Sequence, residues 1–146
     1  MCIRDSVNAP QLAKDHGLEV RELSCSTALD YVNLITLRAG DHSLAGTIAG
    51  RRGEPRIAMV DDHTTDVPPS ANMLVVRNDD RPGMIGVVGT MLGEAGINIA
   101  DMDVGRAARL GSALMVIATT EPAPPSLVEA IRALPGISEV HPLRGD

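Results

Sequence analysis

Residues 73–99 read MLVVRNDDRPGMIGVVGTMLGEAGINI, and this stretch decides the fold of the C-terminal half of the chain. Its first six residues, 73–78, are mostly apolar and predict a buried strand. The next five, Asp79-Asp80-Arg81-Pro82-Gly83, combine a helix-capping carboxylate with a proline suited to the first turn of a helix. Apolar residues then recur at helical spacing as far as Gly96, which predicts a helix that ends there: Ile85, Val88, Leu92 and Ala95.

The rest of the C-terminal half extends this unit to six elements. Strands are predicted at 97–104 and 112–119, on the two sides of a turn at 106–111, and they form a hairpin. Pro124-Pro125 precede a second helix at 126–134, and Pro135-Gly136 end it before a last strand at 137–143. The order βαββαβ predicts a ferredoxin-like fold with a four-stranded sheet and two helices on one of its faces.

The N-terminal half has a different pattern. Residues 1–6 match nothing that follows and are interpreted as a non-native leader, and a short helix is predicted from Pro10 to His16, with Gly17 as its end. Strands are predicted at 18–23, 31–37, 43–48 and 56–60, and the intervening Gly, Asp and Arg residues indicate an antiparallel meander. Val67-Pro68-Pro69-Ser70-Ala71 then predict an extended linker and a domain boundary.

Composition excludes several classes of function. The chain has 146 residues, too few for a complete large enzyme, and 19 acidic against 13 basic residues give a net charge of −6. Without a basic patch, nucleic acid is not expected as a partner, and without an apolar run of about 20 residues no membrane span is expected. Cys2 and Cys25 have no metal-binding or CxxC spacing, which favours reduced thiols in a cytoplasmic protein.

Residues 78–86 and 93–99 carry a resemblance to the ACT domain, a small-molecule sensing module, through DRPGMI followed by GINI. Residues 7–10 and 55–74 resemble the long-type D-3-phosphoglycerate dehydrogenases, in which an allosteric substrate-binding domain precedes an ACT domain. The resemblance implies an α+β chain with an incomplete antiparallel α/β intervening domain at 7–66, a linker at 67–71 and an ACT domain at 72–146.

This resemblance implies a regulatory, C-terminal part of an NAD-dependent enzyme of L-serine biosynthesis, which senses an amino acid, L-serine first of all, and forms a homo-oligomer. Two alternatives stay open: the regulatory part of an iron–sulfur L-serine dehydratase, and a stand-alone ACT protein. The chain itself is expected to hold no catalytic residue, no metal and no cofactor, because Gly83, Gly86 and Gly89 belong to a helix and form no GxGxxG loop.

The effector site is predicted at the start of the first ACT helix. A free amino acid needs an acceptor for its ammonium group and donors for its carboxylate, and Asp80 with the helix-start amides supplies both. Asp80 and Asn98 are expected at the same edge of the sheet; without a ligand they would be a helix cap and a turn residue. The resemblance extends the set to the whole loop: Asn78, Asp80, Arg81, Pro82, Gly83, Met84, Ile85 and Asn98.

A second candidate site lies in the N-terminal half. Arg51, Arg52, Arg56 and His63 are the basic residues that could form an anion pocket, and in the resembled family this domain takes a phosphorylated substrate. The alternative is a solvated turn. The neighbouring acidic cluster of Asp61, Asp62, His63 and Asp66 is expected to face water and to hold no metal.

Overall fold

In the computed structural model, residues 4–21, 23, 33–61, 63–106 and 111–145 are described. The chain divides into two units, residues 1–30 and 31–146, which are considered separately. In the first unit, helix α1 (Arg4–Asp15) ends where Gly17 takes a positive φ of 72° and Leu18 donates its N–H to the carbonyl of Ala13 at 2.8 Å. The predicted end at Gly17 is therefore confirmed.

Two other predictions for this unit are wrong. The helix begins at Arg4 rather than Pro10, because an internal proline costs a helical hydrogen bond but does not have to end the helix. Residues 18–21 and 23 form no strand, although their apolar residues alternate with charged ones. A strand needs a neighbour for its ladder, and none of the described segments pairs with them.

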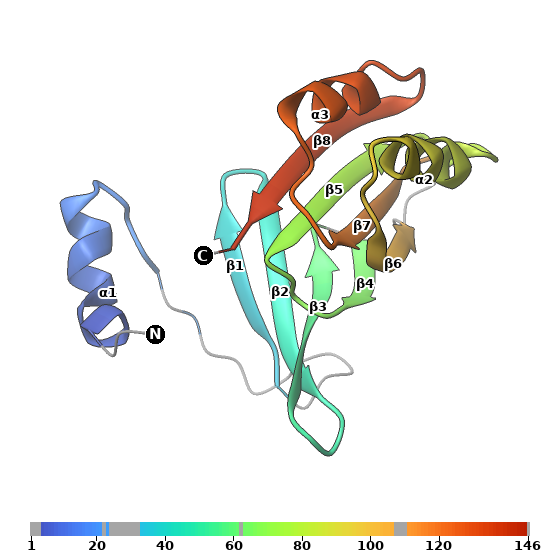
Figure 1. Ribbon diagram of the computed structural model, residues 1–146. Coiled ribbons are helices and arrows are strands. Elements are labelled where there is room, and N and C mark those ends of the chain that lie inside the picture. Colours follow the sequence, from blue (N-terminus) through green and yellow to red (C-terminus); the bar gives the residue numbers. More distant parts are fainter. Residues whose placement is uncertain (1–3, 22, 24–32, 62, 107–110, 146) are drawn as a thin grey trace. The chain divides into compact units, whose positions relative to one another are not determined.

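The second unit begins with a four-stranded antiparallel meander in the order β1-β2-β3-β4 (Figure 1). Its strands are β1 (Ile35–Ala39), β2 (His42–Ala49), β3 (Glu54–Val60) and β4 (His63–Val67). β1 starts at Ile35, within the predicted 31–37, of which residues 31–32 lie outside the described part. The predicted meander is thus present with four strands, but β4 takes the place of the strand predicted at 18–23.

The strand that the sequence pattern does not predict is β4, which contains His63 and Asp66 of the cluster expected to face water and Val67 of the predicted linker. His63, Thr65 and Val67 are buried and the intervening Thr64 and Asp66 are exposed, so the strand has the usual alternation. Because two of the buried residues are polar, hydropathy alone did not reveal this alternation. Val67 belongs to the strand, and the extended connection to the next sheet is 68–71.

The C-terminal sheet has the order β6-β7-β5-β8 and carries its two helices on one face (Figure 1). The elements follow the predicted βαββαβ order: β5 (Asn72–Asn78), α2 (Met84–Glu94), β6 (Ile99–Arg106), β7 (Ala113–Thr119), α3 (Pro125–Arg132) and β8 (Ile137–Arg144). The fully buried Leu92 of α2 and Ile131 of α3 pack with Leu74, Val76 and Ile117 of the sheet. The ferredoxin-like fold and the α+β class are therefore confirmed.

The meander covers the other face of this sheet. Ile57, Val60 and Val67 pack against five residues of the sheet: Met73, Val75, Leu114, Val116 and Ala118. The two layers approach closely at Gly105 of β6, where a Cβ atom would lie 2.6 Å from the carbonyl oxygen of Thr64. The second unit is therefore three-layered, with helices, a central sheet and the meander.

Candidate functional site

The loop of residues 79–83, between β5 and α2, is shaped by a buried amide. Asn78 is 3% exposed, and its Oδ1 accepts the backbone N–H of Asp80 at 3.0 Å. Its Nδ2 donates to the carbonyl of Ala113 at 3.2 Å. Asp80 thereby adopts a left-handed φ of 51°, a conformation that Asp tolerates better than most residues. Asn78 thus fixes the path of the loop.

The other end of the loop rests on the turn between α3 and β8. The backbone N–H of Asp79 donates to the carbonyl of Gly136 at 3.0 Å, and the Asp79 carboxylate pairs with Arg81 Nε at 2.6 Å. The loop is therefore held from two sides, by β7 through Asn78 and by the α3–β8 turn through Asp79.

Helix α2 begins without the predicted carboxylate cap. Its N-cap residue is Gly83, with a φ of 94°, and no side chain caps the helix. Asp80 lies three residues before the cap, because two positive-φ residues turn the loop before the helix starts. The amides of Ile85 and Gly86, in the first turn, have no acceptor within the helix, and the helix dipole favours negative charge there.

A hollow of about 510 Å³ opens at this helix start. It is lined by Asn78 and by residues 80–86, and its far wall consists of Val104, Ala113 and Met115 from β6 and β7. A carboxylate, backbone donors and apolar side chains thus face one space. This arrangement suits a small zwitterion, whose ammonium group needs an acceptor and whose carboxylate needs donors.

Asn98 does not lie at this edge of the sheet. Asn78 pairs with Ala113 at the start of β7, whereas Ile99, which follows Asn98, pairs with Thr119 at its end. The expectation that Asp80 and Asn98 share an edge is therefore wrong within one chain. The reason is topological: β5 and β6 both pair antiparallel with β7 and so run parallel to each other, and the crossover through α2 places the start of β6 at the end of the sheet opposite the end of β5.

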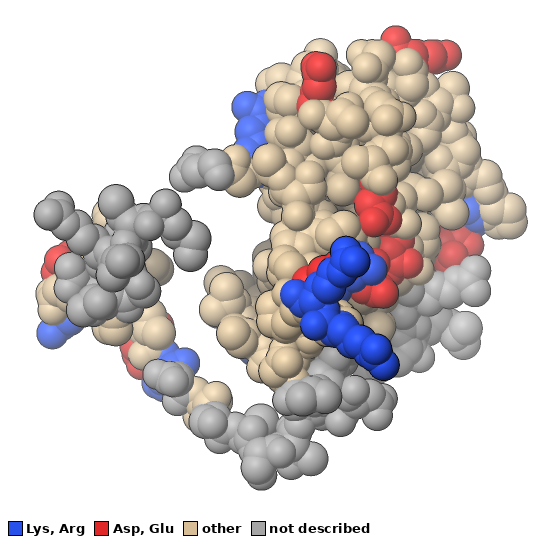
Figure 2. Space-filling view, turned by 60° about the horizontal axis from the view of Figure 1, so that its bottom comes forward, with Lys and Arg blue, Asp and Glu red and all other residues tan. Residues whose placement is uncertain are grey.

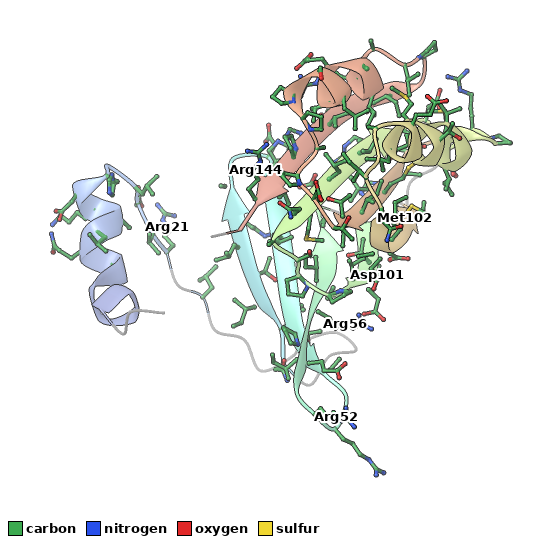
Figure 3. All side chains as sticks on the ribbon, viewed as in Figure 1. Arg21, Arg52, Arg56, Asp101, Met102 and Arg144 are labelled. Carbon is green, nitrogen blue, oxygen red and sulfur yellow. The ribbon has the colours of Figure 1, made fainter. Side chains whose placement is uncertain are left out.

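The four predicted anion-site residues are not brought together. Arg51 and Arg52 lie in the exposed turn between β2 and β3, where Arg52 points away from the sheet (Figure 3). Arg56 lies on β3 and pairs with Asp66 at 3.1 Å. His63 is fully buried, with its Nε2 3.4 Å from Ser112 Oγ. On the face shown in Figure 2, basic side chains border acidic ones.

The neighbouring carboxylates of Asp61 and Asp66 bond to other residues of the chain. Asp61 bonds to Ser43 and Arg77, Asp66 pairs with Arg56, and Asp62 lies outside the described residues. Across the described part of the chain, no group of three or more His, Cys, Asp or Glu side chains is arranged to hold a metal ion. The described helices include none with the length and hydropathy needed to span a membrane.

An ionic cluster that the sequence motifs do not predict joins the meander to the central sheet. Arg77 of β5 donates to Asp61 Oδ2 at 2.5 Å and lies 3.4 Å from Glu139 of β8. His42 and His141 meet edge to face nearby, with ring centroids 5.8 Å apart. The feature of the sequence that indicates this cluster is Arg77, a charged residue within a mostly apolar strand.

The electrostatics of this cluster centre on Asp61. Burial acts to raise the pKa of the Asp61 carboxyl, but the backbone N–H of Ser43, the ring of His42 and the positive charge of Arg77 outweigh it. The pKa of Asp61 is therefore held below its ordinary value, and the carboxylate is ionised at neutral pH.

Comparison with known protein families gives a match for residues 72–136, the stretch from the start of β5 to the turn that holds the loop. The chain contains an ACT domain. The hollow lies between the first strand and first helix of this ACT domain, with β6 and β7 as its far wall. The predicted resemblance to ACT is thus confirmed.

Similarity to whole proteins extends beyond the ACT domain. The chain is 36% identical over 142 residues to D-3-phosphoglycerate dehydrogenase of Synechocystis, which covers 94% of the chain and 26% of that protein. The enzymes of the same name from Methanocaldococcus jannaschii and Bacillus subtilis are 35% and 31% identical over 136 and 140 residues, covering 92% and 93% of the chain and 26% of each relative. The chain thus spans about a quarter of the length of these relatives and is homologous to their C-terminal region.

Proposed function

We propose that this chain is the amino-acid-sensing regulatory part of a D-3-phosphoglycerate dehydrogenase and that L-serine is its effector. The observation that carries the proposal is the hollow at the start of α2, in which the Asp80 carboxylate and the first-turn amides of an ACT domain face one space. The names of the relatives support the assignment to D-3-phosphoglycerate dehydrogenase, and the match to the ACT domain supports a regulatory role. The two alternatives open from the sequence, a dehydratase part and a stand-alone protein, receive no support from the comparisons.

In this proposal, each polar group of L-serine has a partner of opposite character. The Asp80 carboxylate accepts from the ammonium group, and the amides of Ile85 and Gly86 donate to the carboxylate. Hydrogen bonds to charged groups contribute about 1.5–3 kcal/mol each, so these contacts supply most of the binding free energy. The side-chain amide of Asn98 is left for the serine hydroxyl or carboxylate.

Asn98 reaches such a site only from a second copy of the chain. β6 is an edge strand of the ACT sheet, and Asn98 precedes its first residue. If two copies pair antiparallel along β6, the start of each β6 comes to lie beside the end of the other. It then lies next to the partner's loop of residues 79–83, which is called the effector loop below. The proposed sensor is therefore a homo-oligomer, and its edge strand is covered in the assembly.

The described residues do not fit the NAD cofactor that a dehydrogenase uses. A dinucleotide places its pyrophosphate at a glycine-rich helix start. In this chain the carboxylates of Asp79 and Asp80 lie in the loop before α2, where they would repel a pyrophosphate. We therefore assign no step of the redox reaction to these residues.

Calorimetric titration of the purified chain with millimolar L-serine tests the proposal. Heat is expected with L-serine and much less with D-serine, whose ammonium and carboxylate groups cannot both reach their partners with the same side-chain placement. Asp80→Asn should abolish most of the heat, whereas Glu54→Gln, at the exposed start of β3, should leave it unchanged. Absence of heat with the wild-type chain would reject L-serine as the effector.

A further inference from the structure

Two consecutive residues at the end of β5 point to different parts of the molecule. Successive side chains of a strand face opposite sides of its sheet. Asn78 bonds to the effector loop through Asp80 and to β7 through Ala113. Arg77 bonds to Asp61 of the meander. The end of β5 therefore contacts the effector loop through Asn78 and the meander through Arg77.

The link from Arg77 to the meander has a defined geometry. The Asp61 carboxylate is held by the backbone N–H of Ser43 at 2.8 Å, and the Asp61 N–H donates to the Ser43 carbonyl at 2.7 Å. Asp61 itself has a left-handed φ of 52°. Arg77 therefore meets an acceptor fixed to β2, and the side chains of Arg77 and Asp61 are only 21% and 14% exposed.

This largely buried pair depends on close approach, because its hydrogen bond weakens steeply when the distance lengthens or the angle bends. A shift of β5 that carries Arg77 out of reach of Asp61 would also move Asn78, the next residue. Glu139, on the neighbouring strand β8, forms an ion pair with Arg77, with its Oε2 3.4 Å from Arg77 Nε.

We propose that the Arg77–Asp61 pair couples amino-acid binding at the effector loop to docking of the meander on the ACT sheet, with Arg77 as a positioning residue that does not touch the ligand. The inference rests on the proposed function of the loop and adds its route of regulation. Because coupling is reciprocal, breaking the pair weakens ligand binding, and bound ligand tightens the contact between the two layers.

The first test measures L-serine affinity in Asp61→Asn. We expect at least about fivefold weaker binding, the lower end of ordinary coupling between sites. Asp66→Asn is the matched control, since Asp66 pairs with Arg56 inside the meander, and it should bind as the wild type does. Wild-type affinity in Asp61→Asn, or an equal loss in both variants, would overturn the coupling. No binding by the wild-type chain would instead reject the proposed function.

The second test is decided by the wild-type chain, and a variant serves only as a comparison. Hydrogen exchange of the Ser43 amide, which Asp61 holds, is followed with and without saturating L-serine. Slower exchange with L-serine in the wild type, and no slowing in Arg77→Met, is the expected result. If L-serine binds with measurable heat but leaves exchange at Ser43 unchanged, the effector loop and the meander are not coupled and the inference fails.

Discussion

Asp79 donates its backbone N–H to the carbonyl of Gly136 at 3.0 Å, so the effector loop lies directly on the turn between α3 and β8. A Cβ atom on Gly136 would lie 2.7 Å from Asp79 Oδ1, and the φ of Gly136 is 91°. A side chain at this position would have to displace the side-chain ends of Arg81 and Asp79, and the positive φ is a conformation that glycine adopts easily. The position of the loop depends on this glycine.

Gly136→Ala should therefore destabilise the fold and weaken effector binding together. Backbone strain and displacement of Asp79 should lower the free energy of unfolding by about 2–3 kcal/mol. Gly40→Ala is the matched control, with a φ of 59° and nothing within 4 Å of its Cβ position, and it should cost only about 1 kcal/mol. Urea unfolding of both variants measures the difference, and equal losses would contradict the role of the contact.

Gly105→Ala tests the contact between the meander and the edge of the ACT sheet. The added methyl group would lie 2.6 Å from the backbone oxygen of Thr64, which cannot rotate away. We expect the free energy of unfolding to fall by about 1–3 kcal/mol, the usual cost of overpacking. Relative to the wild type, hydrogen exchange should become faster in β4 and change less in β7. Wild-type exchange in β4 would show that the two layers adjust without separating.

The elements around the effector loop were predictable because their signals are local. Strand β5 and helix α2 follow from an apolar run, a proline, a glycine and apolar residues at helical spacing, all within 27 residues. The loop residues that line the hollow follow from the same stretch. What failed within it was the cap, because Asp80 and Gly83 both take positive φ and delay the helix.

The remaining features depend on contacts between distant parts of the chain. β4 was missed because His63 and Thr65 are polar residues that tertiary packing buries. Asn98 was placed at the wrong edge because its position depends on the crossover and not on its own neighbours. The Arg77–Asp61 pair joins residues 16 apart on two sheets, and no local pattern encodes it.

Stability at acidic pH should report on Asp61. Its pKa is lowered in the folded state, so its contribution is present above the ordinary value of 3.8 and is lost as the pH falls through the lower folded value. Asp61→Asn should therefore be less stable than the wild type at pH 7, with the difference shrinking below pH 3.8. Urea unfolding at several pH values measures this, and a difference independent of pH would contradict the assigned pKa direction.

The chain alone should have no dehydrogenase activity. No glycine-rich dinucleotide loop is found among the described residues, and carboxylates stand before α2 where a pyrophosphate would lie. Reduction of NAD with 3-phosphoglycerate by the purified chain should equal the blank. A rate above the blank that is retained after repurification would show that these residues carry chemistry not recognised in the fold.

The last prediction concerns the two residues that a serine site would take from different subunits. Asp80→Ala removes a charged acceptor and should weaken L-serine binding by about ten- to a hundredfold. Asn98→Ala removes a neutral amide whose hydrogen bond water can partly replace. It should therefore lower the free energy of L-serine binding by only about 1 kcal/mol. Because the Asp80 loop and Asn98 lie at opposite ends of the strands of one ACT sheet, the proposed site takes Asp80 from one chain and Asn98 from another. Mixing the two variants under conditions that exchange subunits should therefore restore one native site in each mixed dimer. A mixture that binds no better than the average of its components would show that Asn98 is not shared between subunits.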